Sequence, residues 1–291
     1  MFNIKQNIKL NFFFSLFFLS AMEEKHSEPH LQCKANEFIR DVKIVHKAVR
    51  YMYPNTKIAF RAIPGIHDTA RSMSRTTWFN ERLRRWCYHN DSTYLYSYIT
   101  NNPRFWNPDR YHPSALGTQN MAQILFRQMD LLTTDFDGNQ LNDIIHTITE
   151  PFATYTITQS IDTSATPPLP CDYYFPAERD NTLEFIHNQV IGFSGLNIKW
   201  RFPSKPTDDV IILLGDESLK YLVDPCINFP PQQHDYCLFT GMLTEGKMMN
   251  AIPELMNFDK KYINRPHNSI KMYKDPAAVI LHFGIHDVLA C

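Results

Sequence analysis

The stretch Asp209-Val210-Ile211-Ile212-Leu213-Leu214-Gly215-Asp216-Glu217-Ser218 decides the fold class. Its unbroken apolar run from Val210 to Leu214 is typical of a strand that is buried on both faces of a parallel sheet. The glycine that ends the run predicts a tight turn, and a short helix is expected from Ser218 to about Leu222. A strand, a turn and a helix in this order form the building unit of α/β proteins.

A second run of the same kind covers Ala277 to Phe283 and ends at Gly284. A helical pattern from Met248 to Met256 lies between the two runs. Together these features predict that residues 207–291 form one part of an α/β domain.

An earlier segment, residues 34–133, has the same character. Apolar residues recur at three- and four-residue steps from Glu37 to Met52, which predicts a helix with one buried face. Strands and helices are then expected to alternate, with strands at 57–63 and 94–99 and helices at 77–86 and 117–132. Residues 134–206, which contain the run Thr166-Pro167-Pro168-Leu169-Pro170, are interpreted as a linker or an insertion.

The composition excludes some classes of function. The 29 Lys and Arg residues balance 30 Asp and Glu residues, so the charge does not predict binding to nucleic acid or to an anionic membrane. The six cysteines are scattered, with no Cys-x-x-Cys pair and no cluster at zinc spacing, so no metal site is expected. In an exported protein the cysteines could form disulfides, and all 15 pairings stay open.

The first 21 residues have the pattern of a secretory signal peptide. Lys5 and Lys9 precede the apolar run from Phe12 to Leu19, and the small residues Ser20 and Ala21 follow it. The run is shorter than the roughly 20 apolar residues that span a bilayer, so no stable membrane insertion is expected. Secretion is therefore predicted; the alternative is an apolar leader with no targeting role and a cytoplasmic protein.

Three loops are candidates for a site, because ligands bind at the carboxyl ends of the strands in parallel α/β sheets. Two of them directly follow the apolar strands, at Gly215-Asp216-Glu217-Ser218 and at Gly284-Ile285-His286-Asp287. The third, Asp109-Arg110-Tyr111-His112-Pro113, precedes the helix expected at 117–132.

These loops resemble the sequence blocks of the SGNH (GDSL-type) esterase and acylhydrolase family. Leu213-Leu214-Gly215-Asp216 is similar to the start of its Gly-Asp-Ser block, and Gly246 to its Gly block. Residues 280–287 are similar to its Gly-x-Asn-Asp block, and Asp109-x-x-His112 to its Asp-x-x-His block. The likeness covers about 180 residues, 36–132 and 208–291, and implies a flavodoxin-like three-layer α/β/α sandwich with a parallel sheet.

The resemblance also implies roles for individual residues. Ser218 would be the nucleophile, His112 the general base and Asp109 the group that orients it, while Gly246 and His286 would lie at the oxyanion hole. The implied substrate is a small-molecule ester or acylated compound, and the implied mechanism needs no cofactor. The alternative for Ser218 is that it caps the helix that follows, and the alternative for the pair at 109 and 112 is a turn that caps the next helix.

Two departures from the family pattern bear on activity. The nucleophile of the family directly follows the aspartate, where this chain has Glu217, and a shift by one helical residue turns a side chain by about 100°. The oxyanion asparagine is replaced by His286, and loss of one oxyanion donor slows other enzymes by about 10²–10³-fold. The sequence thus supports an impaired ester hydrolase, a pseudoenzyme that keeps the cleft for binding, or a truncated gene product without folded function.

The order of the blocks is a third departure, because the Asp-x-x-His block comes first here and last in the family. One interpretation is a single circularly permuted domain, whose two segments share one sheet. The other is a fragmentary chain, with the end of one repeat followed by the start of the next, which would leave open sheet edges. The sequence indicates neither the substrate nor the oligomeric state.

Overall fold

A computed structural model describes residues 29–64, 70–97, 103–108, 113–154, 190–201, 209–223, 236–263 and 275–289. Its centre is a sheet with the strand order β2-β1-β7-β5-β6-β4-β3. The strands are β1 (Lys57–Arg61), β2 (Thr93–Leu95), β3 (Val190–Ile191), β4 (Asn197–Arg201), β5 (Asp209–Gly215), β6 (Tyr236–Leu243) and β7 (Ala278–His282).

The strands β2, β1, β7, β5 and β6 run parallel to one another. Strand β4 pairs antiparallel with β6, and β3 pairs antiparallel with β4. Strand β7 pairs with β1 on one side and with β5 on the other, in the registers Phe60 with Leu281 and Leu214 with Leu281. The two α/β segments of the sequence therefore contribute strands to one sheet, in which β1 of the first segment lies next to β7 of the second.

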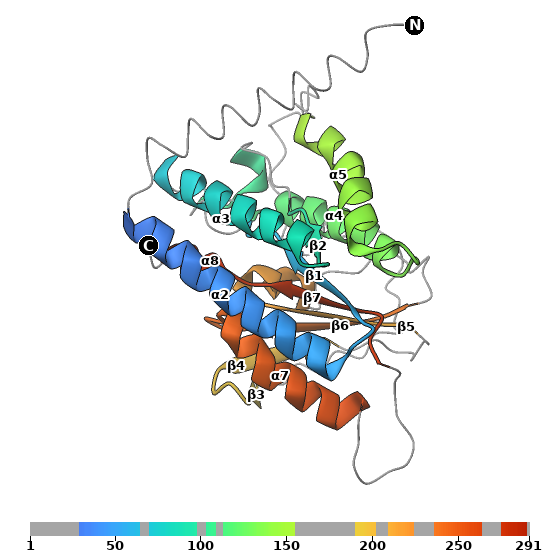
Figure 1. Cartoon of the computed structure of the whole chain (residues 1–291). Helices are drawn as coiled ribbons and strands as arrows, with labels where there is room; N and C mark the ends of the chain where they lie inside the picture. The colour runs from blue at the N-terminus through green and yellow to red at the C-terminus, as the bar shows by residue number, and fades with distance from the viewer. Residues whose placement is uncertain are drawn as a thin grey trace, which may run out of the picture.

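Helices cover both faces of the sheet (Figure 1). One face carries α2 (Pro29–Met52), α3 (Ala70–His89), α7 (Ala251–Phe258) and α8 (Ile285–Leu289), and the other carries α4 (Ala115–Leu132), α5 (Gly138–Thr154) and α6 (Lys220–Val223). Shorter helical turns are η1 (Pro103–Phe105), η2 (Glu217–Leu219), η3 (Met248–Asn250) and the π-helical η4 (Asp259–Ile263). This mostly parallel sheet between helices confirms the expected α/β class.

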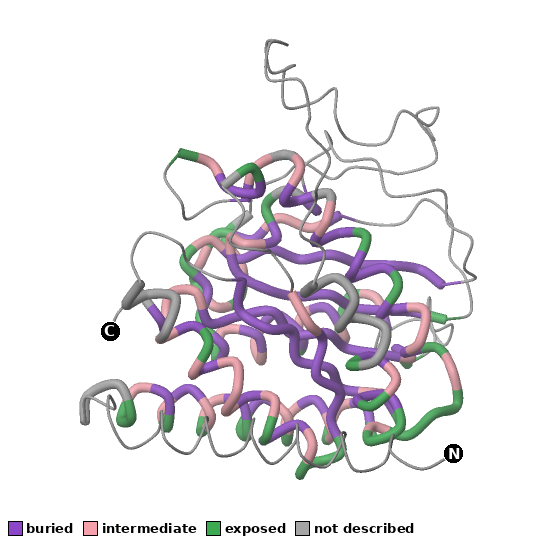
Figure 2. The backbone as a smooth tube through the Cα atoms, turned by 90° about the horizontal axis from the view of Figure 1, so that it is seen from above, coloured by how far each residue is buried: buried purple, intermediate pink, exposed green. Residues whose placement is uncertain are grey.

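The side chains of β5 explain its unbroken apolar run. Val210, Ile212 and Leu214 pack in the hydrophobic cluster beneath α2 and α7, whereas Ile211 and Leu213 pack in the cluster beneath α4 and α5. Successive side chains of a strand point to opposite faces, so a strand covered on both sides needs apolar residues at every position. Figure 2 shows this buried layer running through the middle of the molecule.

Residues 134–206, interpreted as a linker or an insertion, contribute α5, β3 and β4. Leu141 and Ile145 of α5 are fully buried in the cluster beneath α4, and β4 pairs with β6. This part of the chain thus belongs to the packed structure where it is described.

Several sequence expectations fall outside the described residues. The leader 1–21, the residues Asp109 and His112, and three of the six cysteines are among them. Within the described ranges, no helix has the length and apolar character needed to cross a bilayer.

Candidate functional site

The loops after β5 and β7 meet at the carboxyl edge of the sheet, and the Asp216 carboxylate joins them. Oδ1 of Asp216 accepts hydrogen bonds from the backbone N–H and the hydroxyl of Ser218, at 3.0 and 2.6 Å. Oδ2 accepts from the backbone N–H groups of Gly284 and Ile285, at 3.1 and 3.2 Å. Because β5 and β7 are adjacent and parallel, their ends bring these loops within reach of one side chain.

Asp216 is buried, with an exposed fraction of 1%. Its removal from water raises the pKa of the carboxyl group above its usual range, although the hydrogen bonds from Ser218 and Ile285 and the charge of His286 favour the ionised form. The same side chain caps the N-terminus of η2. The cap of the turn is therefore Asp216, and Ser218 is the second residue inside it.

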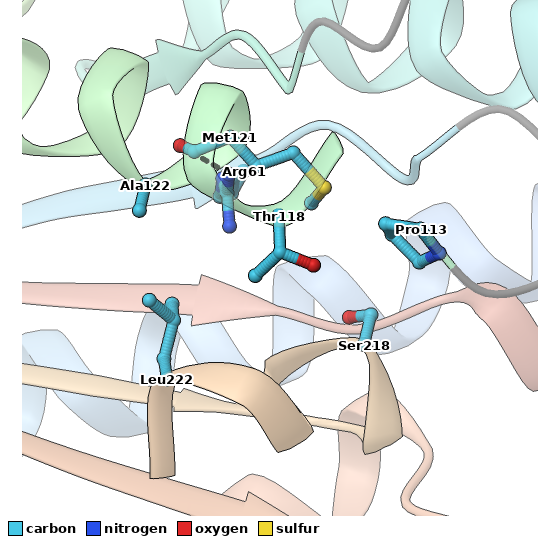
Figure 3. Close-up of a pocket in the computed structure, with 7 residues that line it drawn as sticks. All are labelled: Arg61, Pro113, Thr118, Met121, Ala122, Ser218 and Leu222. Atoms are coloured by element: carbon cyan, nitrogen blue, oxygen red, sulfur yellow. Dashed lines mark hydrogen bonds between the residues drawn. The ribbon is translucent and has the colours of Figure 1, made fainter. Parts of the chain in front are cut away.

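Ser218 lies at a small pocket between η2 and the start of α4 (Figure 3). Its cavity has a volume of about 10 Å³, which is room for about one water molecule. Its polar lining comes from Arg61, Thr118 and Ser218, and its apolar lining from Pro113, Met121, Ala122 and Leu222.

Pro113 connects this pocket with the third loop of the sequence analysis, because it directly follows His112 in the chain. The described structure thus brings the loop after β5 and the residue next to the Asp109–His112 pair to the same cavity. The positions of Asp109 and His112 themselves lie outside the described residues.

The two residues that depart from the family pattern face each other. Oε2 of Glu217 lies 3.9 Å from Nε2 of His286, at the edge of an ion pair that forms when the imidazole is protonated. Nε2 of His286 is shielded from solvent and has no hydrogen-bond partner in the part of the chain that the structure describes. A carboxylate and an imidazole therefore occupy neighbouring positions beside the Asp216 bridge.

Gly246 is buried and directly follows the turn that Thr244 and Glu245 form after β6. A Cβ added there would come within 2.7 Å of Cβ of Leu243 and 3.2 Å of the ring of Phe283, so only glycine fits this close approach. Phe283 directly precedes Gly284. The described contacts thus place Gly246 against the β7 loop and do not join it directly to Ser218.

Asp287, next to His286, is partly buried. Burial raises the pKa of its carboxyl group to about 6, with the charges of Asp41 and Asp216 acting in the same direction and that of Lys247 opposing them. The site thus contains two carboxyl groups, those of Asp216 and Asp287, that hold their protons more tightly than they would in water.

Arg61, at the end of β1, is a site residue that the sequence analysis did not identify. Its side chain is fully buried, and Nη2 donates a hydrogen bond to the backbone oxygen of Met121 at 3.2 Å. Among the described residues, Nε and Nη1 have no hydrogen-bond partner, and neither does the buried hydroxyl of Thr118. An arginine within the otherwise apolar run from Ile58 to Ile63 was the signal that could have revealed it.

His282 lies one position beyond the paired residues Phe60 and Leu281, beside Arg61. Burial first, and the charge of Arg61 second, lower the pKa of its imidazole well below the usual value, so His282 is neutral at physiological pH. Burial also lowers the pKa of Arg61, to about 9, which leaves the guanidinium charged at neutral pH.

Within the described ranges, no three side chains of His, Cys, Asp or Glu are arranged to hold a metal ion. Comparisons with protein-family models, curated proteins and solved structures found no match. The functional argument therefore depends on the residues of this chain.

Proposed function

We propose that this protein is an SGNH-like hydrolase of small esters, with its blocks in circularly permuted order. The observation that carries the proposal is the meeting of three loops at one edge of the sheet. Asp216 ties the loop of Ser218 to the loop of His286, and Ser218 shares a pocket with Pro113, the neighbour of His112.

The strand order supports the permutation. If strands are counted from β5 onward, β5, β6 and β7 become the first three, and β1 and β2 become the fourth and fifth. The parallel part of the sheet then runs 2-1-3-4-5, which is the flavodoxin-like order.

Helix α2 gives independent support. In the family, a helix with the pattern of residues 37–52 follows the Gly-x-Asn-Asp block. Here α2 packs against α8, which follows β7, and also against β1, the strand paired with β7. β7, α8, α2 and β1 thus lie next to one another in space, in the order in which an ordinary member of the family has them along its chain. In this chain, however, β7 and α8 come after α2 and β1.

In the proposed reaction, Oγ of Ser218 attacks the carbonyl carbon of the ester while His112 accepts the hydroxyl proton. The tetrahedral intermediate then collapses and expels the alcohol, which receives the proton from His112 as it leaves. Water hydrolyses the acyl-enzyme by the same steps. The Ser218 hydroxyl donates to Asp216 in the described structure, so it must turn toward His112 before it reacts. This competition for the proton predicts slow turnover.

A second candidate function is ligand binding without catalysis. It is favoured by the contact between Glu217 and His286, at the two positions where the family has its nucleophile and its oxyanion donor. A carboxylate attacks esters poorly, and here it lies beside an imidazole that would otherwise be free to stabilise an oxyanion. In this interpretation the cleft is retained and the chemistry is lost.

The test is the intact mass of the folded protein after treatment with a fluorophosphonate, followed by peptide mapping. A hydrolase forms an adduct on Ser218, and the adduct disappears in Ser218→Ala and in His112→Ala. Circular dichroism of the same samples checks that each variant is folded.

The absence of an adduct on folded wild-type protein would contradict the hydrolase proposal. The binding interpretation further predicts that Glu217→Ser gains an adduct at position 217, because this change restores the family pattern. A Glu217→Gln variant is the matched control, since it removes the charge but supplies no hydroxyl nucleophile.

A further inference from the structure

The balanced charge of the whole chain conceals an uneven distribution. Helices α2 and α3 together carry ten of the 29 Lys and Arg residues but three of the 30 Asp and Glu residues. They span 24 and 20 of the 291 residues, so basic side chains are concentrated in these two helices and acidic side chains are depleted. The overall charge therefore does not describe this part of the surface.

The two helices lie side by side and run in the same direction (Figure 1). Phe38 of α2 packs against Phe79 of α3, and His46 packs against Trp86 further along, with ring centroids 5.7 and 5.3 Å apart. These contacts hold the helices together over about two turns. The sides of α2 and α3 that face away from the sheet therefore form one continuous surface.

One side of α2 carries exposed basic and apolar side chains. Arg40, Ile44, Lys47 and Tyr51 are exposed and recur at three- and four-residue steps, so they form a row along the helix. Lys43 is exposed as well and borders this row. In the described part of the chain, Lys43 and Lys47 form no ion pair, so their charges are available to a partner.

The acidic residues of α2 neutralise little of this charge. Glu37 pairs with Lys34 at 3.3 Å, outside the row. Asp41 lies 3.7 Å from Arg40, but the side chain of Arg40 keeps an exposed fraction of 68%. Exposed pairs of this kind are weak in water, so the guanidinium of Arg40 can still attract an anion.

The neighbouring surface of α3 is also basic. Nη2 of Arg82 donates a hydrogen bond to Oδ1 of Asn36 on α2 at 2.7 Å, which places this guanidinium at the junction of the two helices. Glu81, the one acidic residue in the sequence of α3, accepts from Arg84 and Arg85 at 2.9 and 2.8 Å. One negative charge thus lies between two positive charges, and the surface stays positive.

We propose that the outer surface of α2 and α3 binds a membrane surface that contains anionic lipids. This surface, the basic face, consists of Arg40, Lys43, Lys47, Arg82 and Arg85 with the apolar side chains of Ile44 and Tyr51. Its basic side chains would contact the anionic headgroups. Ile44 and Tyr51, with exposed fractions of 40% and 90%, would enter the boundary between the headgroups and the acyl chains.

The exposed apolar side chains favour a lipid surface over a nucleic acid. Both partners offer phosphates, but interfaces with nucleic acids are mostly polar and would leave Ile44 without an apolar partner. The proposal goes beyond ester hydrolysis, because the basic face lies on the outside of two helices and the candidate site lies at the carboxyl edge of the sheet. The fluorophosphonate experiment is therefore independent of it.

The test is sedimentation of the whole chain with vesicles of phosphatidylcholine alone, or of phosphatidylcholine with about 30% phosphatidylserine, whose negative surface potential attracts basic side chains. We expect at least about tenfold tighter binding to the vesicles that contain phosphatidylserine at about 50 mM salt. Most of this difference should disappear at about 500 mM salt, because the Debye length then falls below 10 Å.

Matched variants locate the binding surface. The double variant Lys43→Gln/Lys47→Gln should bind the phosphatidylserine vesicles about 30-fold more weakly, since each basic side chain near such a surface contributes about fivefold. Arg127→Gln/Lys220→Gln is the control: it removes the same charge from exposed positions of α4 and α6, on the other face of the sheet, and should leave binding unchanged. Circular dichroism checks the fold of each variant.

A third double variant tests the apolar contribution. Ile44→Gln/Tyr51→Gln keeps every charge and should weaken binding to the same vesicles by at least about threefold, because less apolar surface leaves water. Binding to a double-stranded DNA oligonucleotide at equal phosphate concentration is the comparison for the polyanion alone, and we expect it to be weaker than binding to the vesicles.

Four results would overturn the proposal. The wild type could bind both kinds of vesicle equally, or the variants of α2 and the control could lose the same amount of binding. The Gln substitutions at Ile44 and Tyr51 could leave vesicle binding unchanged. Tighter binding to the DNA than to the phosphatidylserine vesicles would instead identify the basic face as a surface for nucleic acid.

Discussion

A single side chain, Asp216, organises the carboxyl edge of the sheet. Its two oxygens accept hydrogen bonds from Ser218 on one side and from Gly284 and Ile285 on the other. Four donors converge on one buried carboxylate, so the loops after β5 and β7 share a common acceptor. The identity of the residue between Gly215 and Glu217 therefore determines how both loops are held.

We expect Asp216→Ala to destabilise the protein by about 3 kcal/mol or more, because it leaves three buried or partly buried N–H groups without their acceptor. Urea denaturation measures the loss, and hydrogen exchange should show faster exchange at the amides of Gly284 and Ile285. Asp137→Ala is the control, since Asp137 is an exposed helix cap that accepts from Gln140 and should contribute about 1 kcal/mol. Equal losses for the two variants would contradict the bridging role.

The residues of the site were predictable to different degrees. The rule that ligands bind at strand ends was sufficient to select Gly215–Ser218 and Gly284–Asp287, and the structure joins these two loops. The rule could not reveal the Asp216 bridge, because its donors are backbone groups 68 and 69 positions away. The burial of Arg61 could not be predicted from the sequence, because a charged residue at the end of a strand usually points to solvent. Only the packing of β1 against α4 shows that this arginine is buried.

At the scale of elements, the strands buried on both faces were predictable and some of their neighbours were not. β5 and β7 are continuous apolar runs, so their positions follow from the sequence. β6 is equally buried, but Thr240 and Gly241 interrupt its run. A Cβ at Gly241 would come within 2.8 Å of side-chain atoms of both Leu214 and Trp200, so close packing between strands requires a residue that weakens the strand pattern.

Helix α5 was missed for a related reason. Its middle is rich in β-branched residues, in the run Ile144-Ile145-His146-Thr147-Ile148-Thr149, and such residues have low helix propensity. The helix is stabilised by burial of Leu141 and Ile145 and by the contacts that α5 makes with α4 and β2. Tertiary packing thus overrides the local preference.

If α5 is part of the core, Leu141→Ala should destabilise the protein by about 2–5 kcal/mol, because it opens a cavity in a fully buried site. Asn139→Ala, at an exposed position in the same helix, should change stability by no more than about 0.5 kcal/mol. The measurement is equilibrium unfolding in urea followed by circular dichroism. If α5 were a helix in a linker that does not pack against the core, both substitutions would change the free energy of unfolding by small and similar amounts.

At the scale of the whole molecule, the alternative of one shared sheet or two incomplete halves depends on β7. This strand lies between β1 and β5, so neither segment can complete its own sheet edge without the other. The hydrophobic clusters on both faces likewise combine residues from both segments, such as Val45 with Val279 and Leu125 with Ile280. Domain boundaries drawn from the sequence blocks therefore do not mark independently packed units.

A circular permutant tests this arrangement directly. Joining Cys291 to Met1 and opening the chain between residues 164 and 165 restores the block order of the family and keeps every residue. We expect the permutant to fold, with a melting temperature within about 5 °C of the natural order, because the cut lies outside the described sheet and helices. Aggregation of the permutant, while the natural order melts cooperatively, would contradict the shared sheet.

The central place of β7 also has a consequence for synthesis on the ribosome. The other six described strands emerge before it, yet β1 and β5 each lack a neighbour until it arrives. The nascent chain therefore exposes an unpaired edge of β1 from the time β1 emerges, and an unpaired edge of β5 from the time β5 emerges, until β7 joins them. We expect these unpaired edges to make the nascent chain prone to aggregation until β7 is in place.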